Sequence, residues 1–324
     1  MHSPRGALAM LETPRRLTPL RIAVQVVGFA IGVALLVWCV ALAVGKADPE
    51  QWSRLRASGW APAAWLLGLT LFTVVFNGLA FWVTLLPLRR LKPADLIAVN
   101  ALATMLAYLP FKLGALARVV IHRRRDNVPF RDIIAWLAGY SALSLATLVP
   151  LVVVVGLRPR LDALTVGLAL AGALAANGAG VALGRLSERR TWLAALSMGS
   201  WRVVRHPAPV AMCAGAKLAD VAVHAARFTV AAGALGIDLS LDRAVVFALA
   251  YFLLGVLSPV GMVGIREGGL ALGGAALFAL DEAARADLAR LVLLVSASEV
   301  VAIVPLAFLG GAWLRVDRLL WKRS

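Results

Sequence analysis

Histidine and cysteine are scarce in this sequence, which removes two classes of chemistry. The 324 residues include 4 His and 2 Cys. The histidines show no HExxH or other metal-binding spacing, so we expect no metal ion and no other cofactor. Cys39 and Cys213 stand alone in apolar runs and form neither a CxxC motif nor a disulfide framework. Redox chemistry is therefore not indicated.

Aromatic residues are also few, at 7%, and acidic residues are outnumbered, with 17 Asp and Glu against 33 Lys and Arg. A net charge of +16 can indicate a nucleic-acid partner. However, no glycine-aromatic run and no basic helix occur outside the apolar segments, so bases have no stacking platform. We expect no nucleic-acid partner.

Sequence motifs for nucleotide hydrolysis and for serine-dependent hydrolysis are lacking as well. The glycines at Gly261 and Gly264 come without the strand, Lys and Ser or Thr of a phosphate loop. No GxSxG motif is present. We expect a protein that is not an enzyme.

What the sequence has instead is long apolar stretches, with 61% hydrophobic residues, 15% charged residues and a mean hydropathy of +0.85. At about 1.5 Å per residue, an uninterrupted stretch of about 20 residues crosses a hydrocarbon core of roughly 30 Å. We expect a cytoplasmic segment 1–21, a transmembrane domain 22–314 and a cytoplasmic tail 315–324. The predicted spans are 22–44, 61–86, 133–157, 164–183, 210–235 and 291–313. The first resembles a signal peptide near Ala41, but its apolar run is long for one and favours an uncleaved anchor.

Two further apolar regions, 95–121 and 243–280, are interrupted by helix-breaking residues. The first stops at Pro110 and resumes after Gly114, and the second stops at Ser258 and resumes at Gly268. The halves are too short to span a membrane. The first region is therefore either a re-entrant hairpin or one kinked span.

The positions of Lys and Arg favour the hairpin. If region 95–121 enters and leaves on one side, 20 of the 33 Lys and Arg share that side, in both termini and in loops 89–92, 123–131 and 185–205. A single span would remove this excess. The positive-inside rule then predicts both termini on the cytoplasmic side of the inner membrane. The half-length helices of region 243–280 predict re-entry from the opposite side, an inverted arrangement typical of transporters.

A row of ionisable residues lies within the fifth predicted span. Lys217, Asp220, His224 and Arg227 fall within an arc of about 80° at about 100° per residue, so they share one helix face. Asp220 can neutralise Lys217 or Arg227, and Glu299 of the last span is a candidate counter-charge for either cation. The row is either a structural ion-pair network or a contact to substrate.

Polar residues also gather at the two breaks. Asn100, Lys112 and Arg118 surround the first break, and Arg266 and Glu267 begin the half-helix after the second. Free backbone N–H groups and the helix dipole favour an anion at such a site. Cations near both breaks predict an anionic headgroup as ligand. The alternative is that Glu267 caps its helix and pairs with a neighbouring arginine.

These two segments carry a family resemblance. Asn100 followed by LPFKLGALAR at 109–118 resembles the "N…P…G…R" segment of the lysylphosphatidylglycerol synthase transmembrane-region family, and the run from Gly261 through Gly264 to Arg266-Glu267 resembles its "PGGxGxRE" segment. The likeness extends from about residue 22 to 314 and is specific at these two places. The family is similar to the flippase half of enzymes that aminoacylate phosphatidylglycerol, and related domains accompany polyprenyl-phosphate glycosyltransferases and hopanoid pathways.

The resemblance implies handling of lipids, with two departures. The sequence predicts no soluble aminoacyl-transferase domain, so we do not expect lipid aminoacylation. Val260 and Met262 also stand where the family favours Pro and Gly.

We therefore expect an all-α polytopic membrane bundle, with about six spans and two inverted hairpins, that moves an anionic, aminoacylated or polyprenyl-phosphate-linked lipid between leaflets. One alternative is a membrane-embedded transferase acting on a lipid-linked sugar, with Glu267, Asp220 or Glu299 as general base. Another is a non-catalytic membrane subunit of a separately encoded lipid synthase or glycosyltransferase.

Overall fold

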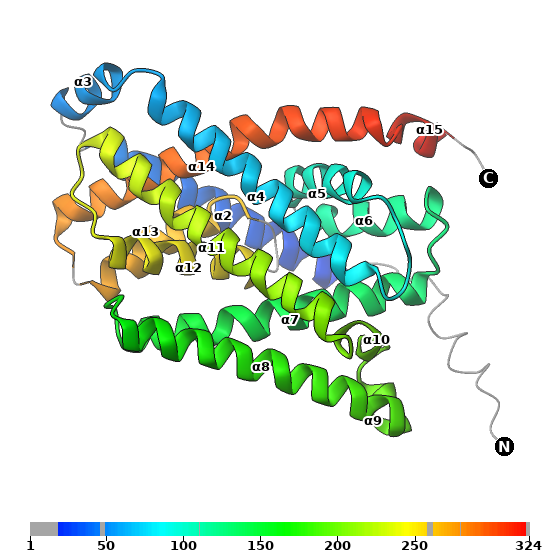
Figure 1. Ribbon diagram of the computed structural model, residues 1–324. Coiled ribbons are helices and arrows are strands. Elements are labelled where there is room, and N and C mark those ends of the chain that lie inside the picture. Colours follow the sequence, from blue (N-terminus) through cyan, green and yellow to red (C-terminus); the bar gives the residue numbers. More distant parts are fainter. Residues whose placement is uncertain (1–18, 46–48, 110, 258–261, 279, 322–324) are drawn as a thin grey trace.

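Every regular element is a helix in the computed structural model, which describes residues 19–45, 49–109, 111–257, 262–278 and 280–321 (Figure 1). Within these residues, six helices are long and apolar enough to cross a membrane. They match the six predicted stretches and confirm the all-α polytopic membrane bundle. These helices are α2 (Pro19–Gly45), α4 (Ala61–Leu85), α7 (Phe130–Leu157), α8 (Ala163–Arg189), α11 (Pro207–Leu235) and α14 (Glu282–Trp313).

Shorter helices connect the spans or follow them. They are α3 (Pro49–Ala57), α9 (Thr191–Leu196), α10 (Trp201–Val204) and α15 (Val316–Trp321). Most of the predicted segment 1–21 lies outside the described residues, and α15 occupies much of the predicted tail. The last span begins well before the predicted residue 291, because the Asp281 carboxylate caps α14 by accepting from the Ala284 N–H at 2.8 Å.

The first interrupted region forms an antiparallel hairpin, hereafter hairpin 1, of α5 (Pro93–Ala107) and α6 (Leu113–Arg124). At its base, Arg125 Nη2 lies 3.1 Å from Asp95 Oδ1. Gly114 lies so close to the Ala103 carbonyl that any Cβ there would collide with it. The chain therefore leaves and returns at the same end, as predicted, and the single kinked span is wrong.

The second interrupted region forms hairpin 2, of α12 (Leu241–Leu257) and α13 (Ile265–Leu277). Gly269 of α13 faces Leu254 of α12, and Gly274 faces Phe247, so the two helices are antiparallel. Part of the predicted break, 258–261, lies outside the described residues, as does Pro110 of hairpin 1. The second half begins at Ile265 and not at residue 268, because Glu267 caps the first turn of α13.

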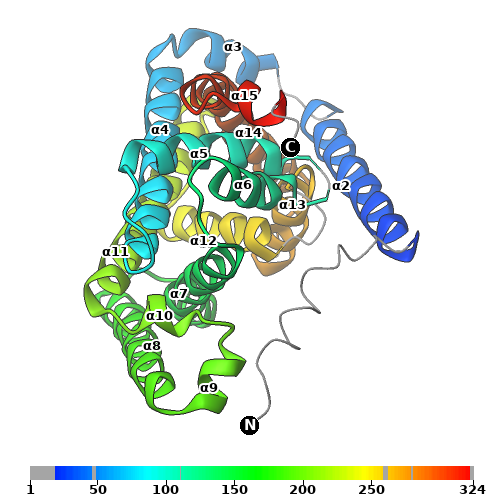
Figure 2. The same ribbon diagram turned by 90° about the vertical axis from the view of Figure 1, so that its right-hand side faces the viewer.

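The tips of the two hairpins meet inside the bundle (Figures 1 and 2). The Met262 N–H of hairpin 2 donates to the Ala107 carbonyl of hairpin 1 at 3.2 Å. Helix α14 passes both hairpins: it starts beside the base of hairpin 2, and its last residue, Trp313, donates to Asp95 at the base of hairpin 1. The hairpins therefore enter from opposite ends, as predicted.

Helix α11 is the most buried of the six spans and packs against α4, α7, α8, α12 and α14. Helices α2 and α8 lie at the periphery and expose apolar side chains such as Val37 and Leu174, as expected for lipid contact (Figure 2). Both cysteines are buried and free. The basic segment 123–131 and α15 share one end, because Arg124 Nη1 donates to the Leu319 carbonyl.

Candidate functional site

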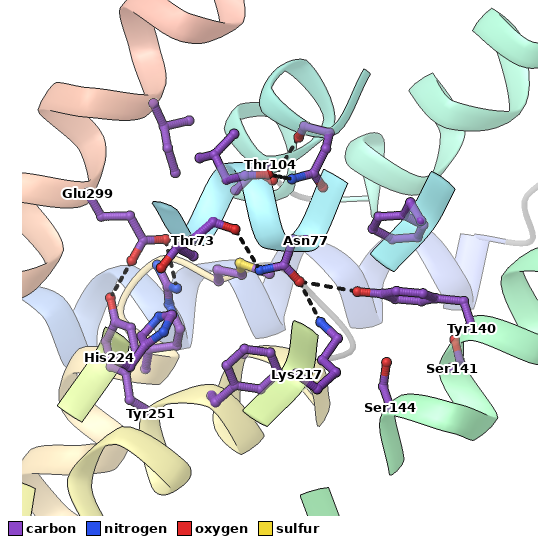
Figure 3. A pocket seen from close by; sticks show the side chains of 18 of the residues that line it. Thr73, Asn77, Thr104, Tyr140, Ser141, Ser144, Lys217, His224, Tyr251 and Glu299 are labelled. Atoms are coloured by element: carbon purple, nitrogen blue, oxygen red, sulfur yellow. Dashed lines mark hydrogen bonds and ion pairs between the residues drawn. The ribbon is translucent and has the colours of Figure 1, made fainter. Parts of the chain in front are cut away.

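A cavity of about 250 Å³ lies where the hairpin tips meet α4, α7, α11 and α14 (Figure 3). Its lining is rich in polar side chains from all of these elements. The predicted site residues that line it are Asn100, Arg118, Lys217, Arg266 and Glu299. Further polar lining comes from Thr73, Asn77, Thr104, Tyr140, Ser141, Ser144, His224 and Tyr251.

Glu299 is shared by two arginines at one side of the cavity. Its Oε2 lies 3.4 Å from Arg227 Nη1, and its Oε1 lies 3.1 Å from Arg266 Nη1. The Tyr251 hydroxyl donates to Oε2 at 3.2 Å. All three charged side chains are buried. The predicted pairing of Arg227 with Glu299 is confirmed, and mutual pairing makes these desolvated charges tolerable.

Lys217 and Asp220 are joined through Asn77 on the neighbouring span. Asn77 Nδ2 donates to Asp220 Oδ2 at 2.7 Å, while Asn77 Oδ1 accepts from Lys217 Nζ and from the Tyr140 hydroxyl. Lys217 and Asp220, both within the described part of the chain, form no direct ion pair. The His224 ring lies close to Asp220, with Nδ1 3.4 Å from Asp220 Oδ1 and 2.9 Å from the Asp220 carbonyl oxygen. Figure 3 shows Lys217 and Tyr140 converging on Asn77.

Arg118 has a different environment. Its Nη2 donates to Asn100 Oδ1 at 2.8 Å, and its guanidinium carbon lies 4.0 Å from the centroid of the Phe81 ring. Asn100 is itself held by Val74, whose carbonyl accepts from Asn100 Nδ2 at 3.0 Å. Within the described part of the chain, no carboxylate lies within ion-pair distance of Arg118.

Four predicted site residues lie off the cavity wall. Lys112 is exposed and has a φ of 50°, since it forms part of the turn that closes hairpin 1. Asp220 and Arg227 are buried behind the lining and contact it through Asn77 and Glu299.

Glu267 also lies off the cavity wall, because it caps its helix. Glu267 Oε2 accepts from the Gly264 N–H at 2.7 Å, and its Oε1 accepts from the Ser296 hydroxyl at 2.7 Å. The capping interpretation is therefore correct. The expected pairing of Glu267 with a neighbouring arginine is wrong, because Arg266 pairs with Glu299.

Sequence reasoning missed several uncharged residues of the site. Asn77, Tyr140 and Tyr251 are single polar groups in apolar helices, and nothing in their spacing sets them apart from packing residues. The one available signal is that Thr73, Asn77 and Phe81 recur every four residues and so share one face of α4.

The cavity and its immediate walls carry more positive than negative charge. The cations are Arg118, Lys217, Arg227 and Arg266, and the carboxylates are Asp220 and Glu299. Adding Glu267 still leaves an excess of one positive charge. This excess of positive charge is an environment that suits an anion.

Fold and site together define a polytopic α-helical membrane protein with a cationic cavity at the meeting point of two re-entrant hairpins. Comparison with protein-family models, with curated proteins and with solved structures found no match.

Proposed function

We propose that the protein moves a lipid with an anionic headgroup between the leaflets of the inner membrane, with the headgroup passing through the central cavity. The observation that carries this proposal is the excess of positive charge at the hairpin tips, about halfway along α14. An unpaired charge at the bilayer centre costs ~2.5 to 3.5 kcal/mol on insertion scales. A cavity with spare donors lowers this cost for a headgroup in transit.

Two features support the proposal. Broken helices that meet from opposite faces are the arrangement by which many transporters build a site near the midplane. The segments around Arg118 and Arg266, which resemble the lysylphosphatidylglycerol synthase transmembrane-region family, line this cavity. The proposed substrates are anionic, aminoacylated or polyprenyl-phosphate-linked lipids. A separately encoded synthase or glycosyltransferase would supply them. The proposal also has both termini in the cytoplasm.

The contacts of the three carboxylates favour transport over transferase chemistry. A general base needs a carboxylate that is free to accept a proton from substrate. Glu299 is held by two arginines and Tyr251, and Glu267 by the Gly264 N–H and Ser296. Asp220 is set behind Asn77.

Reconstitution in vesicles tests the proposal. The purified protein is placed in vesicles that contain phosphatidylglycerol with a fluorescent label on one acyl chain, so that the headgroup is unmodified. Dithionite is then added to bleach the label in the outer leaflet. We expect label from the inner leaflet to become accessible faster than in protein-free vesicles, and the recovered lipid to be chemically unchanged. Equal rates with and without protein, for phosphatidylglycerol and for a polyprenyl phosphate, would refute transport, and a chemically altered lipid would indicate a transferase.

A further inference from the structure

The four cations at the cavity differ in whether a carboxylate already neutralises them. Arg227 and Arg266 share Glu299, and Lys217 is linked to Asp220 by the single bridging residue Asn77. Arg118 contacts Asn100 and an aromatic ring instead. We infer that Arg118 binds the phosphate of the lipid headgroup, whereas Arg266 holds the two hairpin tips together; this inference rests on the proposed function.

The Arg118 guanidinium is oriented before any ligand arrives. Asn100 holds one end of it through Nη2, and its central carbon lies over the Phe81 ring, 4.0 Å from the centroid. Phe81 is in turn stacked on Tyr140, with ring centroids 3.8 Å apart. Among the described residues, the remaining N–H donors of the guanidinium have no hydrogen-bond partner. A planar guanidinium with free donors matches two phosphate oxygens at once, which a lysine ammonium cannot do.

A second spare donor lines the same cavity. The Ser144 side chain is 3% exposed, and its Oγ has no hydrogen-bond partner among the described residues. Burying a hydroxyl without a partner is unfavourable. A phosphate oxygen in the cavity gives this hydroxyl an acceptor.

Part of the cavity wall on α7 belongs to residues that are also exposed at the protein surface. Ser141 and Leu145 of α7 both line the cavity and are exposed on the protein surface, and Arg118 is itself partly exposed. A headgroup can therefore enter from this side while its acyl chains stay in the bilayer. This route favours a phosphate carried by a lipid over free inorganic phosphate.

Arg266 has no comparable freedom. Its Nη1 lies 3.1 Å from Glu299 Oε1, and its Nη2 donates to the Tyr108 hydroxyl of hairpin 1 at 2.8 Å. Its guanidinium carbon lies 4.4 Å from the centroid of the Tyr251 ring. A phosphate that bridged Nη1 and Nη2 would compete with Glu299 and Tyr108. The contacts of Arg266 therefore join hairpin 2 to hairpin 1 and to α14.

Binding of short-chain lipids to the purified full-length protein in detergent tests the assignment. Titration calorimetry compares dihexanoyl phosphatidylglycerol with dihexanoylglycerol, which lacks the phosphate, and with inorganic phosphate. We expect Arg118→Gln to weaken binding of the phosphatidylglycerol by about 10- to 100-fold, since a hydrogen bond to a charged group is lost. Arg118→Lys should lie between Arg118→Gln and the unsubstituted protein. The matched control is Arg123→Gln, which removes a charge from an exposed position on the same helix.

Three outcomes would overturn the assignment. The first is an unchanged affinity in Arg118→Gln. The second is equal binding of dihexanoylglycerol and dihexanoyl phosphatidylglycerol by the unsubstituted protein, a comparison that does not depend on the folding of any variant. The third concerns melting temperature: Arg266→Gln should lower it, whereas Arg118→Gln should leave it nearly unchanged, and the reverse pattern would exchange the two roles.

The same measurements separate this inference from the proposed function. Binding of phosphatidylglycerol that depends on Arg118, in a protein that translocates no lipid, would refute transport and retain the phosphate site. Translocation that is equally fast in Arg118→Gln would retain transport and refute the phosphate site. Tighter binding of inorganic phosphate than of the short-chain lipid would refute the lipid as the source of the phosphate.

Discussion

Replacing Glu299 by Gln tests whether the charges around the cavity form one interdependent set. The substitution keeps the size of the side chain and removes its charge. Arg227 and Arg266 would then lose the carboxylate that lies 3.4 Å and 3.1 Å from them. Both arginines are buried, with 0% and 5% of their surfaces exposed, so bulk water is a poor replacement for the lost partner.

Breaking a buried ion pair by removing one partner costs about 3 to 5 kcal/mol. A native protein is stable by only about 5 to 15 kcal/mol, so a loss of this size removes a large share of the total. We expect Glu299→Gln to lower membrane abundance and to reduce the melting temperature of the purified protein by several degrees. The double substitution Glu299→Gln with Arg266→Gln should be less harmful than the sum of the two single changes, because one unpaired cation is removed.

The matched control is Glu188→Gln, which makes the same chemical change in an exposed ion pair. Glu188 lies 2.7 Å from Arg205, and its side chain is 54% exposed. Pairs of this kind contribute only about 0 to 1 kcal/mol, so the control should retain its abundance and melting temperature. Equal melting temperatures for Glu299→Gln and Glu188→Gln would show that the buried cluster does not stabilise the fold.

Two further predictions concern topology and backbone geometry. Both native cysteines are buried, so they should not react with an impermeant maleimide added to intact cells. The reagent should label Arg285→Cys and leave Arg123→Cys unlabelled, because the positive-inside rule predicts that position 123 is in the cytoplasm. The reverse labelling would refute the orientation. Gly264→Ala should destabilise the protein by at least about 1 to 2 kcal/mol, because Gly264 has a φ of 74° and an added Cβ would collide with the Gly32 carbonyl. In Gly273→Ala an added Cβ would lie more than 4 Å from the neighbouring helices that the structure describes, so thermal unfolding should show little change or a slight stabilisation. Similar losses in both glycine variants would contradict this explanation.

The sequence alone is enough to predict the spans, because length and hydropathy are local properties of the chain. It also predicts hairpin 1, since the number of Lys and Arg on each side depends on whether that region crosses the membrane. The pairing of Arg227 with Glu299 could be expected because a buried arginine needs a carboxylate and few are available within the spans.

The rest of the site depends on how distant helices come together. Asn77 gains its importance from lying between Lys217 and Asp220 of another helix, and its own surroundings in the sequence do not reveal this. Lys112 was expected at the site because it follows the break, yet the left-handed turn of hairpin 1 leaves it at the surface. Side-chain direction at a break depends on backbone dihedral angles that composition does not specify.

The position of Glu299 on the last long helix has a consequence for biogenesis. Chains emerge from the ribosome N-terminus first, so Arg227 and Arg266 enter the membrane before the carboxylate that neutralises both. Until α14 is inserted, the tip of hairpin 2 lacks its counter-charge, although its bonds to Tyr108 and Ala107 of hairpin 1 do not depend on α14. Closure of the cavity is therefore a late event of co-translational assembly, and a nascent chain arrested before residue 299 should expose two unpaired arginines to membrane quality-control proteases.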